Sequence, residues 1–125
     1  MSNVPGDLRY TKDHEWAKRD GGKVRVGITA HAVEQLGDIT LVELPKVGTK
    51  VELGKAFGTV ESVKTLSDLF APIAGTIVEV NEQLASKPEL VNEGPYEQGW
   101  MVVIEPTDVA AYDGLLDAAA YGALL

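Results

Sequence analysis

Short hydrophobic runs, each bounded by glycine or proline, recur along most of the chain. The run KVRVGIT (residues 23–29) alternates between hydrophobic and other side chains, as in a strand with one buried face. The run DITLVEL is expected to place Ile39 and Leu41 on one face and Val42 and Leu44 on the other. Three further runs fit the same description: AFGTVES, GTIVEVN and WMVVIEP. Five or six short strands at this spacing predict a small, mainly β sandwich or barrel.

Two of these runs resemble each other. The segments KAFGTVESV (Lys55–Val63) and PIAGTIVEV (Pro72–Val80) share a glycine, a threonine and an aliphatic residue in the same order. This echo predicts pseudo-two-fold symmetry, with chance similarity as the alternative. The two matching glycines, Gly58 and Gly75, are expected to allow close approach of neighbouring backbones.

Helical signals are few. Thr29 is a suitable N-cap for a short helix, Ala30–Leu36, which Gly37 would end. After Pro106, hydrophobic residues near helical spacing predict a C-terminal helix within an extension of about residues 107–125 that covers the sheet. With 125 residues, the chain is expected to be one domain, residues 1–125.

Charge narrows the choice of partners. The net charge is −8, and residues 65–125 contain one Lys or Arg against ten Asp or Glu. Phosphate backbones would be repelled, so nucleic acid is not expected, and basic patches on other proteins are more plausible docking sites. No apolar run is long enough to cross a membrane, and the N-terminus does not resemble a signal or transit peptide. We therefore expect a bacterial cytoplasmic protein or, alternatively, a mature mitochondrial matrix protein.

The sequence shows no recognisable catalytic or metal-binding constellation. Its histidines are His14 and His31 and it has no cysteine, so a metal site is not expected. It has neither a G-x-S-x-G motif nor a complete phosphate-binding loop. We therefore predict a protein that is not an enzyme.

One lysine stands out because of where it lies. The segment ESVKT falls between two predicted strands without the Gly, Asn or Asp usual in a tight hairpin. A type I turn over Ser62–Thr65 would place Lys64 at the tip with its amine exposed. A modifying enzyme can acylate such an amine and remove its charge.

Seven segments in order carry a family resemblance: HEW, GITAHAVEQLGDI, VELPKVG, ESVKT, APIAGTIVEVNE, PELVN and PYEQGWM. Together they resemble the H protein of the glycine cleavage system, over about Leu8 to Leu116. The resemblance implies a barrel-sandwich hybrid of two small antiparallel sheets with short peripheral helices. It also implies a lipoyl group attached to the lysine of E-S-V-K, which is Lys64 here.

The function implied by the resemblance is carriage. The lipoyl arm would take an aminomethyl group from a pyridoxal-phosphate glycine decarboxylase to a tetrahydrofolate-dependent aminomethyltransferase. It would then pass electrons to a flavin-dependent dihydrolipoyl dehydrogenase. A lipoate-attaching enzyme is a fourth implied partner. The missing cysteines fit, because the cofactor would supply both sulfur atoms.

The resemblance also implies roles for residues around the lysine. Glu15 and Asp68 correspond to carboxylates that hold the loaded arm in a cleft, with ordinary solvated surface charge as the alternative. The chain has Gln35 where some members of the family have a histidine. Glu61, Val63 and Thr65 are expected to help the lipoate-attaching enzyme to recognise the turn, although Glu61 could simply keep the strand end soluble.

Three other functions remain open at this point. A biotin carrier uses a similar lysine, but its lysine normally sits between two methionines, whereas Lys64 lies between Val63 and Thr65. An H-like protein could instead donate or relay lipoyl groups to other complexes. The third alternative is an unmodified interaction domain, for which Lys64 would be dispensable.

Overall fold

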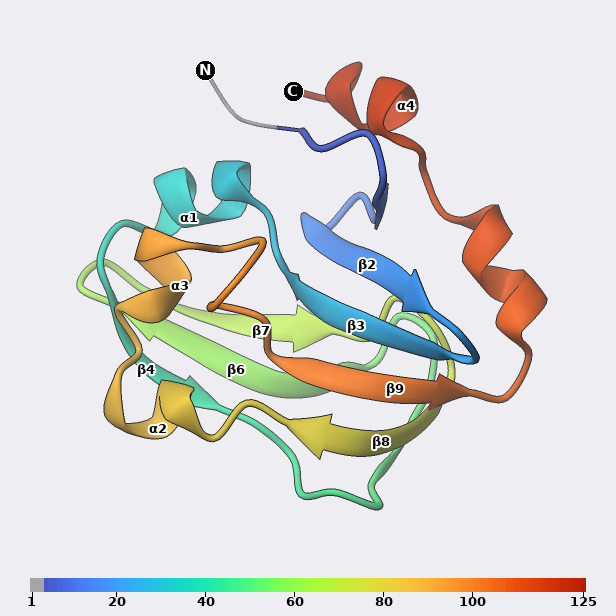
Figure 1. The fold of residues 1–125 in the computed structure, drawn as a ribbon. Helices are drawn as coiled ribbons and strands as arrows, with labels where there is room; N and C mark the ends of the chain where they lie inside the picture. The colour runs from blue at the N-terminus through green and yellow to red at the C-terminus, as the bar shows by residue number, and fades with distance from the viewer. Residues whose placement is uncertain (1–3) are drawn as a thin grey trace.

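The fold is built from two antiparallel sheets (Figure 1). The computed structural model describes residues 4–125, and these form nine strands. The larger sheet has the order β1-β2-β3-β9-β8-β5 and the smaller one the order β4-β6-β7. The strands of the larger sheet are β1 (Arg9–Tyr10), β2 (Glu15–Asp20), β3 (Lys23–Ile28), β9 (Val102–Pro106), β8 (Gly75–Val80) and β5 (Lys50–Val51). Those of the smaller sheet are β4 (Ile39–Glu43), β6 (Ala56–Ser62) and β7 (Leu66–Phe70). The predicted fold class is confirmed.

The two sheets share one hydrophobic core. Strands of the larger sheet contribute Val26, Ile77 and Ile104, and strands of the smaller sheet contribute Val60 and Leu69, all buried. Neither sheet can cover its apolar face alone, so each is stabilised by packing on the other. A second cluster includes Tyr10 and Trp16 from the larger sheet and Tyr121 from the C-terminal segment.

Helix α1 (Ala30–Leu36) leads the chain from the larger sheet to the smaller one. The Thr29 side chain accepts a hydrogen bond from the Ala32 N–H at 3.2 Å, and Gly37 follows with φ 83°. Both ends agree with the sequence prediction. Two further one-turn helices, α2 (Gln83–Ser86) and α3 (Leu90–Glu93), connect β8 to β9.

The glycines of the internal echo occupy comparable positions in the two sheets. A Cβ on Gly58 in β6 would lie 2.4 Å from the Glu43 carbonyl oxygen of β4. A Cβ on Gly75 in β8 would lie 2.3 Å from the Glu105 carbonyl oxygen of β9. The expectation of close backbone approach is therefore confirmed, because only a residue without a side chain fits at either position.

The prediction that Ile39 and Leu41 share one face of β4 is wrong, whereas Val42 and Leu44 both pack on the core as predicted. Ile39 and Val42 are the buried residues, whereas Leu41 is 40% exposed. The register shifts between Ile39, opposite Ser62, and Leu41, opposite Glu61. This bulge turns Leu41 outward, because an extra residue in one strand reverses the alternation that follows it.

The C-terminal helix predicted after Pro106 is divided in two. A 3-10 helix, η1 (Val109–Gly114), is followed by α4 (Ala118–Gly122). Between them Leu116 pairs with Tyr10 through two backbone hydrogen bonds of 2.8 and 2.9 Å. This extended link to β1 interrupts the helical spacing that the sequence indicated.

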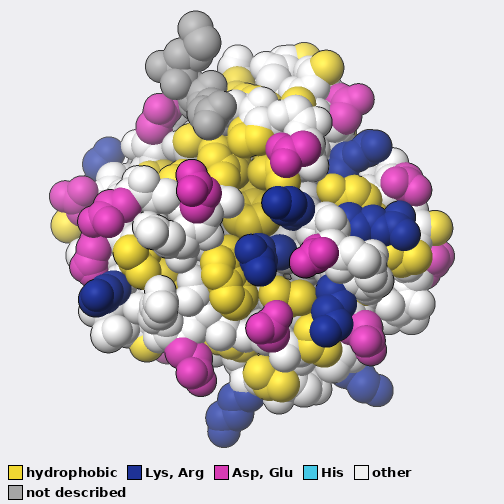
Figure 2. Space-filling model, in the orientation of Figure 1, with side chains coloured by type: hydrophobic (Ala, Val, Ile, Leu, Met, Phe, Trp, Pro, Cys, Tyr) yellow, Lys and Arg dark blue, Asp and Glu magenta, His cyan; other side chains and the backbone are white. Residues whose placement is uncertain are grey.

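The two halves of the sequence, which differ in charge, do not occupy separate sheets. Strands from both halves alternate in the larger sheet, since β9 and β8 lie between β3 and β5. Figure 2 accordingly shows acidic and basic side chains intermixed on one face. Among residues 4–125, no helix is both long and apolar enough to span a membrane.

Candidate functional site

The hairpin between β6 and β7 presents Lys64 to solvent. Its strands pair as far as Glu61 and Leu66, and the Ser62 N–H then donates to the Thr65 carbonyl at 2.8 Å. The buried Ser62 hydroxyl accepts from the N–H groups of Lys64 and Thr65, both at 3.2 Å. These bonds replace the Asn-Gly chemistry of common hairpins, and they hold the backbone at the tip while the Lys64 side chain stays exposed.

Replacing Ser62 with alanine is expected to loosen the tip without unfolding the sheet. The change removes one acceptor shared by two N–H groups, so we expect a loss of about 1–2 kcal/mol in the free energy of unfolding. Urea denaturation would measure the loss, and amide hydrogen exchange would show faster exchange at Lys64 and Thr65. Unchanged exchange at both amides would contradict this account of the hairpin.

The aliphatic part of Lys64 passes close to the end of α1. A Cβ built on Gly37 would lie 3.4 Å from Lys64 Cε and 3.9 Å from Nζ. Gly37 also has a positive φ of 83°, which residues with side chains rarely adopt. The positive φ therefore accounts for a glycine at the end of the helix, and the lysine stem lies within van der Waals distance of this position.

Exposed apolar residues flank the hairpin tip. Leu41, Glu61 and Leu66 are register partners across the three strands of the smaller sheet. All three are exposed, Leu66 by 60%, and Val63 beside the lysine is 67% exposed. This tip surface, formed by Leu41, Glu61, Val63 and Leu66, combines apolar side chains with one carboxylate.

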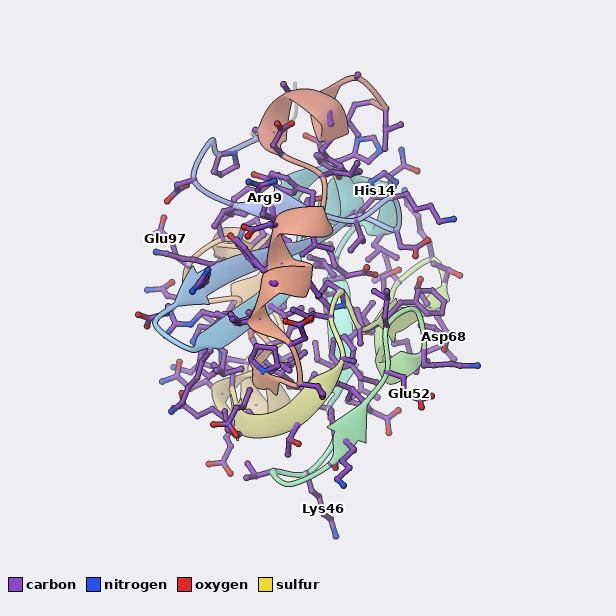
Figure 3. All side chains as sticks on the ribbon, turned by 90° about the vertical axis from the view of Figure 1, so that its right-hand side faces the viewer. Arg9, His14, Lys46, Glu52, Asp68 and Glu97 are labelled. Atoms are coloured by element: carbon purple, nitrogen blue, oxygen red, sulfur yellow. The ribbon has the colours of Figure 1, made fainter. Side chains whose placement is uncertain are left out.

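A cleft of about 140 Å³ lies between α1, the start of β2 and strand β7. It brings together Glu15, Asp68 and Gln35, which are far apart in the sequence. Figure 3 shows Asp68 on the β6–β7 hairpin and His14, the neighbour of Glu15, below α4. The remaining lining residues are Asp13, His14, Ile28, Ala32, Leu36, Val60, Ser67 and Leu69.

Glu15 lines this cleft with a carboxyl group that is buried, which is unusual for an acidic residue. Its exposed fraction is only 2%. One carboxyl oxygen accepts from the Thr11 hydroxyl at 2.6 Å, and the other accepts from the Phe70 N–H at 3.4 Å. Both donors are neutral, so they only partly offset the cost of burying a charge. Burial raises the pKa of Glu15 to about 8. The carboxyl is therefore mostly protonated at neutral pH.

Sequence reasoning missed Thr11 and a second, larger cleft on the other side of Glu15. This cleft, about 380 Å³, shares Asp13 and Glu15 with the first, and Leu53 and Leu115 lie on its other walls. Thr11 lies four residues before Glu15, and this spacing is the sequence signal that could have indicated a local contact. The Thr11 hydroxyl also accepts a hydrogen bond from the Glu15 N–H at 3.3 Å. The walls of the larger cleft come from four separate segments of the chain, which no local pattern connects.

Comparison with known proteins identifies the family. Residues 8–125 match the family model described as glycine cleavage H-protein. The chain belongs to the glycine cleavage H-protein family. A glycine cleavage system H protein from Geobacillus thermodenitrificans is 58% identical over 123 residues, which cover 98% of this chain and 97% of the relative. One from Halalkalibacterium halodurans is 54% identical over 121 residues, or 97% and 94% of the two chains.

A solved structure supports the same assignment. The crystal structure of a glycine cleavage system H protein from Mycobacterium marinum superposes with a TM-score of 0.88 at 47% identity. The match covers 96% of this chain and 97% of that one. The family resemblance is thus confirmed over a longer range than the motifs indicated.

Members of this family share a carrier role and a covalently bound cofactor. H proteins are carrier components of the glycine cleavage system, and they bear a lipoyl group attached covalently to a lysine. The match favours this interpretation over a biotin carrier or an unmodified interaction domain.

Proposed function

We propose that the protein carries a lipoyl group on Lys64 and that the chain itself catalyses no step. The observation that carries this proposal is the position of the Lys64 amine. It projects from a backbone tip held by Ser62, and its stem runs beside Gly37 at the end of α1. Helix α1 also forms one wall of the cleft that contains Glu15 and Asp68. An arm attached to Lys64 would therefore start next to a site able to receive its far end.

The residues present fit a lysine-linked lipoyl group. The Lys64 side chain is exposed, so an attaching enzyme can reach it without opening the fold. When bound, the group supplies a disulfide that accepts an aminomethyl group and two electrons. The cleft supplies carboxyl groups beside apolar side chains, which suit the cationic end of a loaded arm.

Glu15 and Asp68 are suited to hold a cationic amine, such as that of an aminomethyl cargo. Asp68 is exposed at the mouth of the cleft, and Glu15 is buried in its wall. A charge-assisted hydrogen bond from the amine would favour the ionised form of Glu15, which burial disfavours when the cleft is empty. In this proposal the buried carboxyl becomes a strong acceptor only when a cation is present.

The proposed partners follow from the system to which the family belongs. They are glycine decarboxylase, aminomethyltransferase, dihydrolipoyl dehydrogenase and a lipoate-attaching enzyme. The lipoate-attaching enzyme would recognise the turn through Glu61, Val63 and Thr65. The exposed residues Leu41 and Leu66, which belong to the tip surface, enlarge the area available for this contact. We further propose that residues 1–125 act as one domain in a bacterial cytoplasm, because the source organisms of the relatives are bacteria.

The native mass of the protein tests the proposed attachment. We expect protein purified from its own cells to carry one lipoyl increment, and peptide mapping to place it on Lys64. Expression with and without lipoate in a strain unable to synthesise it provides the matched control. A biotin increment, an unmodified Lys64 in native material, or modification of another lysine would each refute the proposal.

A further inference from the structure

The two walls of the Glu15 cleft are joined by a side chain that lies outside it. One wall is the start of β2, with His14 and Glu15, and the other is α1, which begins after Thr29. The Tyr121 hydroxyl lies 2.7 Å from His14 Nδ1 and 2.8 Å from the Thr29 hydroxyl oxygen. Tyr121 comes from α4, near the C-terminus, and does not line the cleft (Figure 1).

The backbone at His14 needs to be held in place. Its φ is 69°, in the left-handed region that residues other than glycine seldom occupy, and it is the only such residue with a side chain among residues 4–125. Because Glu15 follows directly, the conformation at His14 sets where the buried carboxyl points. The His14 carbonyl also accepts from the Thr29 N–H at 3.0 Å, so the two walls meet at this pair of residues.

Tyr121 is fixed well enough to serve as an anchor. Its side chain is fully buried and stacks on Tyr10 with 4.6 Å between ring centroids. The His14 ring meets it edge-on at 5.6 Å, and the His31 ring of α1 lies 4.6 Å from His14 on centroids. A hydroxyl held this rigidly can fix both partners, because little side-chain entropy remains to be lost.

We propose that Tyr121 is a positioning residue for the carrier's cleft: its hydroxyl ties His14 to Thr29 and thereby fixes the Glu15 wall against α1. This inference rests on the proposed role of Glu15 in holding the cargo. It gives the C-terminal helix a function beyond covering the sheet. Loss of the hydroxyl leaves the ring packing intact but lets the two walls move relative to each other.

The test compares two Tyr→Phe variants. Tyr121→Phe removes the anchoring hydroxyl, and Tyr112→Phe is the matched control. Tyr112 is also buried in the C-terminal segment. Its hydroxyl donates one hydrogen bond, to the Ala17 carbonyl at 3.2 Å, whereas the Tyr121 hydroxyl has two partners. Tyr112 does not line the cleft, and its hydrogen bond reaches β2 at Ala17 rather than at the wall residues His14 and Glu15. A purely structural role would give the two variants the same behaviour.

The first readout uses the unlipoylated protein and needs no partner. Amide exchange at Thr29, whose N–H joins the two walls, is expected to become about fivefold faster in Tyr121→Phe, the effect of losing one neutral hydrogen bond. Tyr112→Phe should leave this amide unchanged. Equal exchange at Thr29 in both variants would overturn the proposal whatever the state of Lys64.

The second readout uses the lipoylated protein bearing its cargo, without partner enzymes. Spontaneous ammonia release is expected to be several-fold faster in Tyr121→Phe than in Tyr112→Phe, with equal lipoylation of Lys64 in both. If Tyr121→Phe does not fold, His14→Gly breaks the half of the tether that reaches the Glu15 wall, and glycine accepts the positive φ. Release at the wild-type rate from the folded tether variant would overturn the positioning role. Failure of the wild type to accept lipoate would instead refute the proposed function.

Discussion

Replacing Lys64 with arginine is expected to abolish carrier function completely and to leave the fold unchanged. Arginine keeps the positive charge and nearly the same length, but its guanidinium stays protonated and is not acylated by a lysine-modifying enzyme. The Lys64 side chain is exposed, and the hairpin depends on Ser62 and on backbone hydrogen bonds. The variant therefore loses the attachment point and no packing.

Glycine–bicarbonate exchange in a reconstituted system measures the loss, and circular dichroism and thermal unfolding check the fold. Lys46→Arg is the matched control, because Lys46 is also exposed but lies outside the β6–β7 hairpin, between β4 and β5, where it projects at the foot of the view in Figure 3. It should keep full lipoylation and exchange. Exchange activity retained by Lys64→Arg would show that the amine is not the attachment point. Activity lost together with the fold would show that the lysine is structural.

The features that could be predicted from the sequence are those fixed by neighbouring residues. The cap at Thr29, the stop at Gly37 and the exposed tip at Lys64 each depend on a few consecutive residues. The close approaches at Gly58 and Gly75 were predictable from a repeated local pattern. In each case the local chemistry allows few alternatives, so the prediction survives tertiary packing.

Register between distant strands was not predictable. The bulge in β4 depends on how Ile39 and Leu41 pair with β6, about twenty residues later in the chain. The break between η1 and α4 depends on Leu116 pairing with Tyr10. Strand β2 was not recognised because it ends in the charged residues Lys18–Asp20, and no hydrophobic alternation marks it.

The cleft was predictable only through the family resemblance, and its chemistry was not predictable at all. The sequence shows Glu15 as one carboxyl among many. Its burial arises because β7 and the Thr11 turn close over it, which requires the complete fold. The protonation of Glu15 is therefore a property of the tertiary structure.

Replacing Glu15 with glutamine is expected to remove a pH dependence of stability. In the unfolded chain the Glu15 pKa returns to about 4.5, whereas in the folded protein it is about 8. Between these values the folded state binds more protons than the unfolded state, so stability falls as pH rises and levels off above about pH 8. The slope contributed by one such group is about 1.4 kcal/mol per pH unit.

Urea unfolding of the unlipoylated protein at several pH values from 5 to 8 measures this slope. The wild type is expected to lose stability across the range relative to Glu15→Gln, which stays neutral throughout. Glu97→Gln is the control, since Glu97 is exposed on another side of the molecule (Figure 3), and it should follow the wild type. Asp13, His14 and Asp68 also line the cleft and are the same in all three proteins, so the comparison isolates Glu15. Parallel curves for wild type and Glu15→Gln would mean that the carboxyl is not held neutral.

The same proton bears on the proposed role of Glu15 in holding a cationic cargo. At pH 7 Glu15 is mostly neutral in the empty cleft, and a cationic amine beside it would lower its pKa. Loading at pH 7 is therefore expected to release close to one more proton per molecule in the wild type than in Glu15→Gln, as measured with a pH indicator. The glutamine variant, which cannot ionise, should also lose its cargo faster. A buried glutamate of this kind is ionised only while a cation lies beside it. After the cation has gone the carboxyl takes up a proton, so no uncompensated charge remains in the wall of the cleft.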